Sequence, residues 1–392
     1  MAPRIRGFIS VNAHPDGCAA VVRRQAEVAR AGLAGRRAGN VLVIGSSTGY
    51  GLATVLSAAF GLRANVLGVC FERAATEERT GSAGWYTLAE AHRLARAEGL
   101  LVRTVNGDAF TRAVKQQVVA ELRARFGPLD YVVYSLAAPR RVSPDGAVTW
   151  QSALKPIGAA YTGKAIDLRA DAVVEASIEA ASEQEIADTV RVMGGEDWAD
   201  WIELLADEQL LNDGCRSVAY SYVGPDVTRE IYRSGTIGRA KEHLEATAER
   251  LHGRLADAHG GGAWVSVQTA VVTQASAAIP GVPLYMSIVF AVLRERGLWE
   301  GTIEQVVRLF RDHLAPGALP IVDAQRRIRL DDRELDVSVQ AEVAGRWARV
   351  TTANLHELSD YAGYKHAFEE LFGFGVDGID YAQPTELARE LV

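Results

Sequence analysis

Tyr232 and Lys241 are the residues of this sequence whose types and spacing best suit proton-transfer chemistry. A tyrosine hydroxyl can donate a proton to a reacting group, and a nearby ammonium group favours a polarised phenol. Their spacing, with eight residues between them, is a weak signal alone, but Lys241 falls on the apolar stripe of a predicted helix. That stripe consists of Ile237, Leu244, Ala248, Leu251 and Leu255. An inward lysine on an apolar face costs free energy unless it has a partner or a function, so we interpret Lys241 as functional.

The positions of Tyr232 and Lys241 constrain where this helix begins. On one continuous helix, at about 100° per residue, the two side chains would lie on opposite faces. They can converge only if the helix begins after Tyr232, and residues 234–236 offer capping groups for such a start. We therefore predict a helix over residues 236–259 with Tyr232 just before it. Tyr222, on the preceding predicted strand, is a second candidate donor, for which an ordinary structural role stays open.

A glycine-rich turn follows the first strand signal, residues 41–44. Its glycines, Gly45, Gly49 and Gly51, stand between that strand and an apolar helical stretch. Glycine permits a tight turn close to a phosphate, and the helix N-terminus supplies free N–H groups and a positive dipole. We predict that the turn holds the pyrophosphate of a dinucleotide, with further contacts from Ser46, Ser47, Thr48 and Tyr50. The spacing G-x-x-x-G-x-G differs from the G-x-G-x-x-G fingerprint and is typical of short-chain reductases.

The ends of the next three predicted strands supply the rest of a dinucleotide site. Phe71 and Glu72 end the second strand, where an acidic side chain can bind the adenosine ribose hydroxyls. A carboxylate there repels a 2′-phosphate and favours NADH over NADPH, although Arg73 beside it weakens the argument. The residues after the third and fourth strands would lie along adenine and the nicotinamide ribose: Asp108 with Ala109, and Leu136 with Ala137. The sequence thus predicts an NAD site along one edge of a sheet.

Strand and helix signals alternate along much of the chain. Strand signals lie at residues 41–44, 65–70, 101–105, 131–134, 217–223 and 264–272. Helical patterns lie at about 52–60, 87–98, 112–126, 183–192, 198–206, 236–259, 302–313 and 335–354. This alternation predicts an α/β fold, a Rossmann-like doubly wound, mostly parallel sheet. We predict one elaborated domain over residues 1–392, with an N-terminal hairpin, an insertion over about 143–177 and a C-terminal helical region over about 300–392.

Composition narrows the class of protein. The chain has 42 Lys and Arg against 49 Asp and Glu, a net charge of −7, and no basic run. We therefore expect neither nucleic acid nor anionic lipid as a partner. His14 and Cys18 lack further ligands at a suitable spacing, so we expect no metal and interpret them as part of a packed N-terminal hairpin.

One uncharged segment, residues 269–293, is long enough to be tested as a membrane span. Pro280 and Gly281 are among the residues that break it into a strand-like piece and a short apolar helix. A buried core segment is the better interpretation. The first ten residues have no apolar run typical of a signal peptide, so we expect a cytoplasmic protein without a stable membrane insertion.

The motifs described above, in their order along the chain, resemble those of the FabV-type trans-2-enoyl-thioester reductases. These enzymes are NADH-dependent relatives of the short-chain reductases. The resemblance runs nearly from end to end, through residues 4–9, 14–18, 43–51, 71–73, 134–141, 193–198, the Tyr232–Lys241 pair, 271–276, 279–280, 283–285 and 372–374. Eight residues between the tyrosine and the lysine separate this family from relatives with six or three.

The resemblance implies reduction of the C2=C3 bond of an enoyl thioester, carried by acyl carrier protein or coenzyme A, in fatty acid biosynthesis or a related pathway. Hydride from NADH would go to C3, an enolate would form on the thioester oxygen, and protonation at C2 would complete the reaction. The resemblance assigns the proton donor to Tyr232, a substrate contact to Tyr222 and a cofactor contact to Lys241. It assigns nicotinamide contacts to Val271, Val272 and Thr273, and the wall of an acyl pocket to Ile279 and Leu284.

Two alternatives stay open at this point. A short-chain carbonyl reductase or dehydrogenase could use the same tyrosine and lysine on a C–O centre, and a non-catalytic NADH-binding regulator could keep the fold. The C-terminal region of the family is often described as flavin-binding, but the sequence offers no reason to expect flavin. We expect a monomer.

Overall fold

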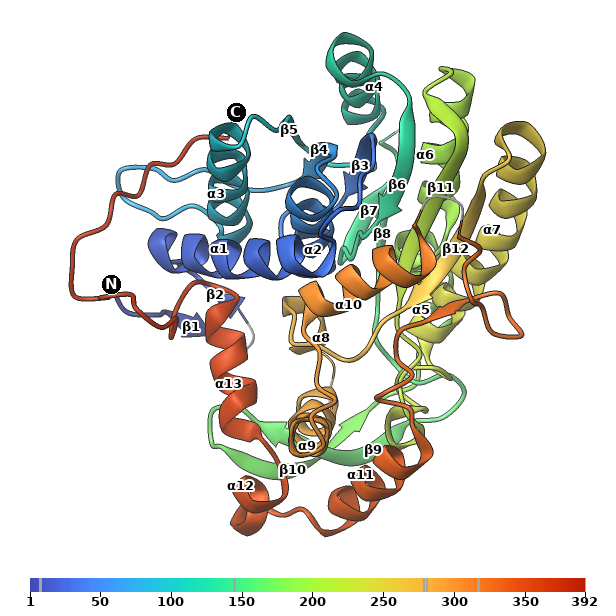
Figure 1. Cartoon of the computed structure of the whole chain (residues 1–392). Helices are drawn as coiled ribbons and strands as arrows, with labels where there is room; N and C mark the ends of the chain where they lie inside the picture. Colours follow the sequence, from blue (N-terminus) through green and yellow to red (C-terminus); the bar gives the residue numbers. More distant parts are fainter. Residues whose placement is uncertain (7–8, 144–145, 278, 280, 316–317, 392) are drawn as a thin grey trace.

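The computed structural model describes residues 1–6, 9–143, 146–277, 279, 281–315 and 318–391 (Figure 1). Its centre is a seven-stranded sheet in the order β13-β12-β11-β6-β3-β4-β5, in which all neighbours are parallel. The strands are β3 (Asn40–Ile44), β4 (Asn65–Cys70), β5 (Val102–Asn106), β6 (Leu129–Tyr134), β11 (Leu211–Ser221), β12 (Gly262–Val267) and β13 (Ile328–Arg329). The strand order reverses between β3 and β6, which is where dinucleotides bind in sheets of this kind. The Rossmann-like prediction is confirmed.

Both faces of this sheet are buried. Val41 and Val43 of β3 belong to one apolar cluster, and Leu42 and Ile44 belong to another on the opposite face. The first face is covered by α1 (Pro15–Gly32), α2 (Gly49–Leu56), α3 (Ala83–Ala97) and α10 (Thr302–Arg308). The second is covered by α4 (Arg112–Glu121), α6 (Glu196–Asp207) and α7 (Thr236–His259). Burial on both faces explains why the strand sequence is an uninterrupted apolar run.

A further helical layer lies beyond the end of the sheet (Figure 1). Its central helix, α9 (Val282–Glu295), is buried at every position from Val282 to Leu293, as expected for a helix that is apolar on nearly all sides. The helices around it are α11 (Val337–Arg349), α12 (Leu355–Leu358) and α13 (Tyr361–Glu370). No helix in the described part of the chain is both long and apolar enough to cross a membrane.

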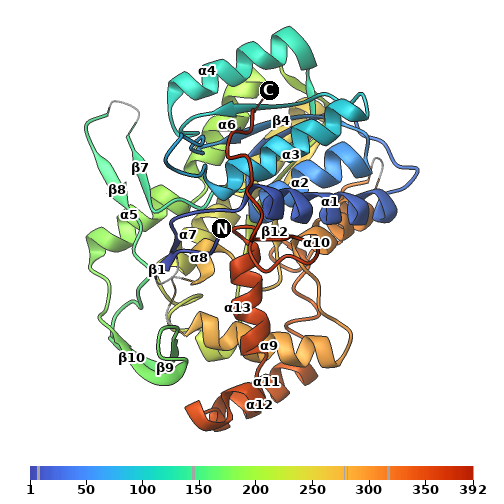
Figure 2. The ribbon, with the colours of Figure 1, turned by 90° about the vertical axis from the view of Figure 1, so that its left-hand side faces the viewer.

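The predicted insertion consists of short antiparallel pairs. The strands are β7 (Arg140–Val142) with β8 (Thr149–Gln151), and β9 (Tyr161–Asp167) with β10 (Ala172–Ile178). Figure 2 shows both hairpins at the side of the molecule, outside the main sheet. Helix α5 (Glu183–Met193) packs between β8 and α7. The insertion therefore reaches the start of α7, where the backbone N–H of Thr236 donates to the carbonyl of Lys155 at 3.0 Å.

The N-terminal prediction is partly wrong. A hairpin is present, with β1 (Ile5–Arg6) paired to β2 (Ile9–Ser10), but His14 and Cys18 are not part of it. His14 caps α1, accepting a bond from the N–H of Gly17 at 3.3 Å, and Cys18 lies inside that helix. The sequence did not indicate α1 because small side chains such as Cys18, Ala26 and Ala29 form much of its buried stripe, which weakens the apolar period.

The predicted strand over residues 264–272 is wrong beyond Val267. The backbone N–H of Thr269 donates to the side chain of Gln305 at 2.8 Å, and that of Ala270 donates to Glu334 at 2.6 Å. These side chains replace a neighbouring strand, so residues 268–273 form an irregular segment at the edge of the sheet. Strand β13 and helix α13 were also not predicted, and Pro280 lies outside the described residues.

Candidate active site

The glycine-rich turn has the geometry of a phosphate cradle. Gly45 has φ 87° and Gly49 has φ 55°, in the left-handed region that favours glycine. A Cβ on Gly45 would lie 2.6 Å from the carbonyl oxygen of Ser135, so this turn touches the end of β6. Thr48 precedes α2 without a side-chain cap, which leaves the first N–H groups of that helix free for an anion. The residues present therefore fit a dinucleotide pyrophosphate.

Glu72 joins this turn to the end of β4. Ser47 Oγ donates to Glu72 Oε1 at 2.6 Å, and the N–H of Glu72 donates to Asn106 Oδ1 at 2.8 Å. A Cβ on Gly84 would lie 2.1 Å from the same carboxylate oxygen, so the carboxylate packs directly against the first turn of α3. Phe71 beside it is 77% exposed. The fixed carboxylate can accept hydrogen bonds from ribose hydroxyls, and the exposed ring beside it can stack on a purine.

The segment after β12 packs against the same turn. Tyr50 donates its hydroxyl to the carbonyl of Thr269 at 2.6 Å and lies 3.0 Å from Gln305 Oε1. The methyl group of Thr273 is 3.8 Å from where a Cβ on Gly49 would stand. The turn after β3 and the loop after β12 are thus held together.

The remaining predicted cofactor residues occupy the same edge. They follow the carboxyl ends of β5, β6 and β12 as Asp108 with Ala109, Leu136 with Ala137, and Val271 with Val272. Ser46 is buried in the turn and its hydroxyl donates to the carbonyl of Val69 at 3.1 Å. Because all these strands are parallel, their carboxyl ends meet at one edge, as the sequence predicted.

Tyr232 lies just before α7, as predicted. The helix begins at Thr236 with Gly235 as its N-cap, and a Cβ there would be 2.8 Å from the carbonyls of Ile231 and Lys155. This close approach, not a positive φ, requires glycine. Tyr232 is 8% exposed.

Lys241 is half-buried on the first turns of α7. Among the described residues, the Lys241 side chain has no hydrogen bond or ion pair, including none with Tyr232. Burial lowers the pKa of Lys241 to about 8, while the charge of Glu245 opposes that change. An ammonium group of this kind is free to bind another molecule.

Tyr222 and Tyr232 form an aromatic pair. Their rings meet edge to face with centroids 5.0 Å apart. Burial raises the pKa of both phenols, and the neighbouring carboxylate of Glu334 raises them further. Both hydroxyls therefore stay protonated at neutral pH. Ile279 and the fully buried Leu284 belong to the same apolar cluster as Tyr232.

Glu334 is a site residue that the sequence did not indicate. It is fully buried and accepts the hydroxyls of Tyr222 and Tyr285, each at 2.6 Å. Glu334 stands in the charged run 331–334, which resembles a solvated surface turn. No period or motif in that run distinguishes the carboxylates that become buried.

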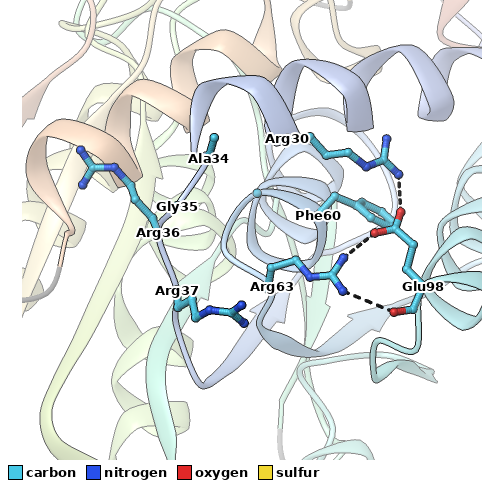
Figure 3. Close-up of a pocket in the computed structure, with 9 residues that line it drawn as sticks. Arg30, Ala34, Gly35, Arg36, Arg37, Phe60, Arg63 and Glu98 are labelled. Carbon is cyan, nitrogen blue, oxygen red and sulfur yellow. Dashed lines mark hydrogen bonds and ion pairs between the residues drawn. The ribbon is translucent and has the colours of Figure 1, made fainter.

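A basic surface pocket lies elsewhere (Figure 3). Arg36 and Arg37 line it just before β3, and Arg63 lines it just before β4. Arg30 and Arg63 both pair with Glu98 there. These residues precede the amino ends of the strands, so the pocket is remote from the carboxyl edge that carries the site.

The strand order and the glycine turn define a dinucleotide-binding protein of the Rossmann class. Family models match nearly all of the chain: the NAD(P)H binding domain of trans-2-enoyl-CoA reductase over residues 1–77, the trans-2-enoyl-CoA reductase catalytic region over 79–315, and an enoyl reductase FAD binding domain over 322–385. The chain belongs to the trans-2-enoyl-CoA reductase family.

Individual relatives agree with this family. The enoyl-acyl-carrier-protein reductase (NADH) of Burkholderia pseudomallei is 53% identical over 385 residues, covering 98% of this chain and 96% of that protein. The corresponding enzyme of Pseudoalteromonas atlantica is 48% identical, covering 97% and 96%. The crystal structure of Treponema denticola trans-2-enoyl-CoA reductase in complex with NAD superposes with a TM-score of 0.95 at 43% identity, covering 100% of this chain and 99% of that one. The resemblance found in the sequence is confirmed.

The family model that matches residues 322–385 is described as an FAD binding domain. In residues 322–385, the one buried side-chain atom without a partner among those described is the Tyr364 hydroxyl. Asp331 is paired with Arg329, and Glu334 is bonded to two tyrosines. These two buried carboxylates are therefore engaged by partners within the protein.

Proposed function

We propose that this chain uses NADH to reduce the C2=C3 bond of a trans-2-enoyl thioester. The observation that carries the proposal is the arrangement of the glycine cradle, the buried Tyr232 and the unpaired Lys241 in a chain of the enoyl reductase family. Bound NADH supplies the hydride that goes to C3. The glycine cradle would hold the pyrophosphate of NADH. Glu72 and Phe71 would bind its adenosine, and Lys241 would bind its nicotinamide ribose.

Tyr232 is the proposed proton donor. Hydride addition at C3 places negative charge on the thioester oxygen, and a protonated phenol aimed at that oxygen stabilises the charge where it forms. The raised pKa keeps the Tyr232 proton in place until then. The hydroxyl of Tyr222 is already donated to Glu334, which favours Tyr232 as the donor and Tyr222 as a substrate contact. Ile279 and Leu284 would line the acyl chain and exclude water.

The central experiment follows NADH oxidation by absorbance with crotonyl-CoA, a longer enoyl-CoA and a ketone. Oxidation with the enoyl thioesters alone supports the proposal. Oxidation with the ketone alone would instead favour a carbonyl reductase, and NADH binding without any oxidation would favour a regulator. A parallel series with NADPH tests whether Glu72 excludes the 2′-phosphate, and enoyl-acyl carrier protein in place of the CoA ester tests the carrier.

Lys241→Met is expected to weaken NADH binding by about 10- to 100-fold, the worth of a charge-assisted hydrogen bond. With a pKa of about 8, the Lys241 ammonium is present below pH 8 and lost above it. Wild-type NADH affinity should therefore fall between pH 7 and 9.5, whereas the variant should be weak and independent of pH. Fluorescence titration of NADH measures both. Lys365→Met, at an exposed ion pair on α13, is the control that should match the wild type. Equal affinity of the Lys241 variant and the wild type would contradict the proposed role.

We further propose a cytoplasmic monomer that folds as one unit and acts in fatty acid biosynthesis or a related acyl pathway. The support for one unit is an apolar cluster that joins residues from Ala13 to Phe374. Light scattering should give the mass of one chain, and calorimetry should give one unfolding transition. A dimer mass would reject the monomer, and two separate unfolding transitions would reject the single folding unit.

A further inference from the structure

The carboxyl group of Glu334 connects three segments that meet at the site. Its Oε1 accepts the hydroxyl of Tyr222, which follows β11, and that of Tyr285 on α9, each at 2.6 Å. Its Oε2 accepts the backbone N–H of Ala270 at 2.6 Å. Gln340 on α11 donates to the carbonyl of Glu334 at 2.7 Å and so fixes the turn that carries it. Every oxygen of this carboxyl group is engaged.

These partners lie beside the reacting centre rather than in remote core. Tyr222 meets Tyr232 edge to face, and Ala270 directly precedes the loop 271–273. No lysine, arginine or histidine in the described part of the chain pairs with Glu334. A buried carboxylate without a cation destabilises the folded protein unless hydrogen-bond donors satisfy it. The donors to Glu334 are residues of the candidate site.

We propose that Glu334 is a positioning residue for the reduction, holding Tyr222 and the loop after β12 in the geometry that the substrate needs. The inference rests on the proposed roles of Tyr222 and Tyr232. It gives residues 322–385 a part in the reductase site itself.

The protonation state of Glu334 makes this role measurable. Burial raises its pKa to about 7, and the bonds from Tyr222 and Tyr285 oppose that rise. The other ionisable groups that interact with Glu334 are Tyr50, Tyr232 and Asp331. The ionised form accepts all three bonds, whereas the protonated form gives up one acceptor position to its own proton. We therefore expect kcat/KM to rise with pH through about 7, because kcat/KM reports the free enzyme.

The first variant is Glu334→Gln. An amide can accept the tyrosine hydroxyls through its oxygen, but its NH2 group then faces the N–H of Ala270, so one side of the cluster is lost. We expect kcat with crotonyl-CoA to fall about tenfold or more, with NADH affinity changed by less than about threefold. The inflection near pH 7 should disappear. Glu334→Asp keeps the charge and should restore part of kcat together with the inflection.

Two further measurements separate positioning from general stability. Asp331→Asn alters another fully buried carboxylate on the same turn, one that pairs with Arg329. It should lower the melting temperature but keep kcat and the inflection, moved slightly to lower pH because a neighbouring charge is gone. In a double-mutant cycle, Tyr222→Phe with Glu334→Gln should be no worse than the more severe single variant, since one acts through the other.

The outcomes are distinct. An inactive wild type with every enoyl thioester would overturn the proposed function. An active wild type whose kcat and pH profile match those of Glu334→Gln would overturn the role of Glu334 alone, as would fully additive losses in the cycle. If Glu334→Gln fails to fold, the Asp variant and Tyr222→Phe still decide. Tyr222→Phe removes a donor that lowers the pKa of Glu334, so a shift of the inflection to higher pH supports the inference and an unmoved inflection opposes it.

Discussion

Tyr232→Phe is expected to lower kcat for crotonyl-CoA by about 10²- to 10⁴-fold, the range for removal of a general acid. The phenol is buried and protonated at neutral pH, and Tyr222, whose ring packs against it, donates its hydroxyl hydrogen bond to Glu334. No equivalent donor can therefore replace it without breaking a buried hydrogen bond. Steady-state rates and NADH fluorescence titration together test this, since NADH affinity should stay within about threefold of wild type.

Tyr364→Phe is the matched control for this substitution. Tyr364 is a buried tyrosine whose hydroxyl has no hydrogen-bond partner among the residues that the structure describes, so its removal breaks none of the bonds seen there. This variant should turn over like the wild type. Wild-type kcat in Tyr232→Phe would reject Tyr232 as the donor, and a rate that is instead lost in Tyr222→Phe would transfer that role to Tyr222.

Gly51→Ala is expected to weaken NADH binding by about 100-fold or more, as two charge-assisted backbone bonds to phosphate are each worth about 1.5–3 kcal/mol. The added Cβ would lie 1.7 Å from the carbonyl oxygen of Gly45, closer than atoms can approach. The first turn of α2 must then move away from the end of β3, and the pyrophosphate loses its N–H donors. Overpacking of this kind should also reduce stability by about 1–3 kcal/mol.

Gly253→Ala provides the matched control, because it makes the same chemical change inside another helix. A Cβ at Gly253 of α7 meets no atom within 4 Å. This variant should keep NADH affinity and gain up to about 1 kcal/mol, since alanine is the better helix former. NADH titration and thermal unfolding of both variants decide the matter. Undiminished NADH binding by Gly51→Ala would reject the assignment of this glycine-rich turn to the pyrophosphate.

Much of the central fold and of the cofactor edge could be predicted from local patterns. The apolar runs of β3, β4 and β6 alternate with helices, and that alternation predicts a parallel sheet whose carboxyl ends gather the dinucleotide residues. Helix α7 was predicted to begin at Thr236 because a nine-residue offset between Tyr232 and Lys241 is incompatible with one continuous helix. Helix α1 was missed for an equally local reason, the small side chains of its buried stripe.

By itself, then, the sequence determined what depends on short-range periodicity and on glycine chemistry: the layers, the cradle and the placement of Tyr232 before its helix. The tertiary structure alone decided which carboxylate meets the tyrosines. Glu334 is 112 residues from Tyr222 and 64 from Ala270, and its neighbours Asp331 and Asp332 look no different along the chain. A buried carboxyl group is selected by the donors around it, and those donors come from three segments that only the folded chain brings together.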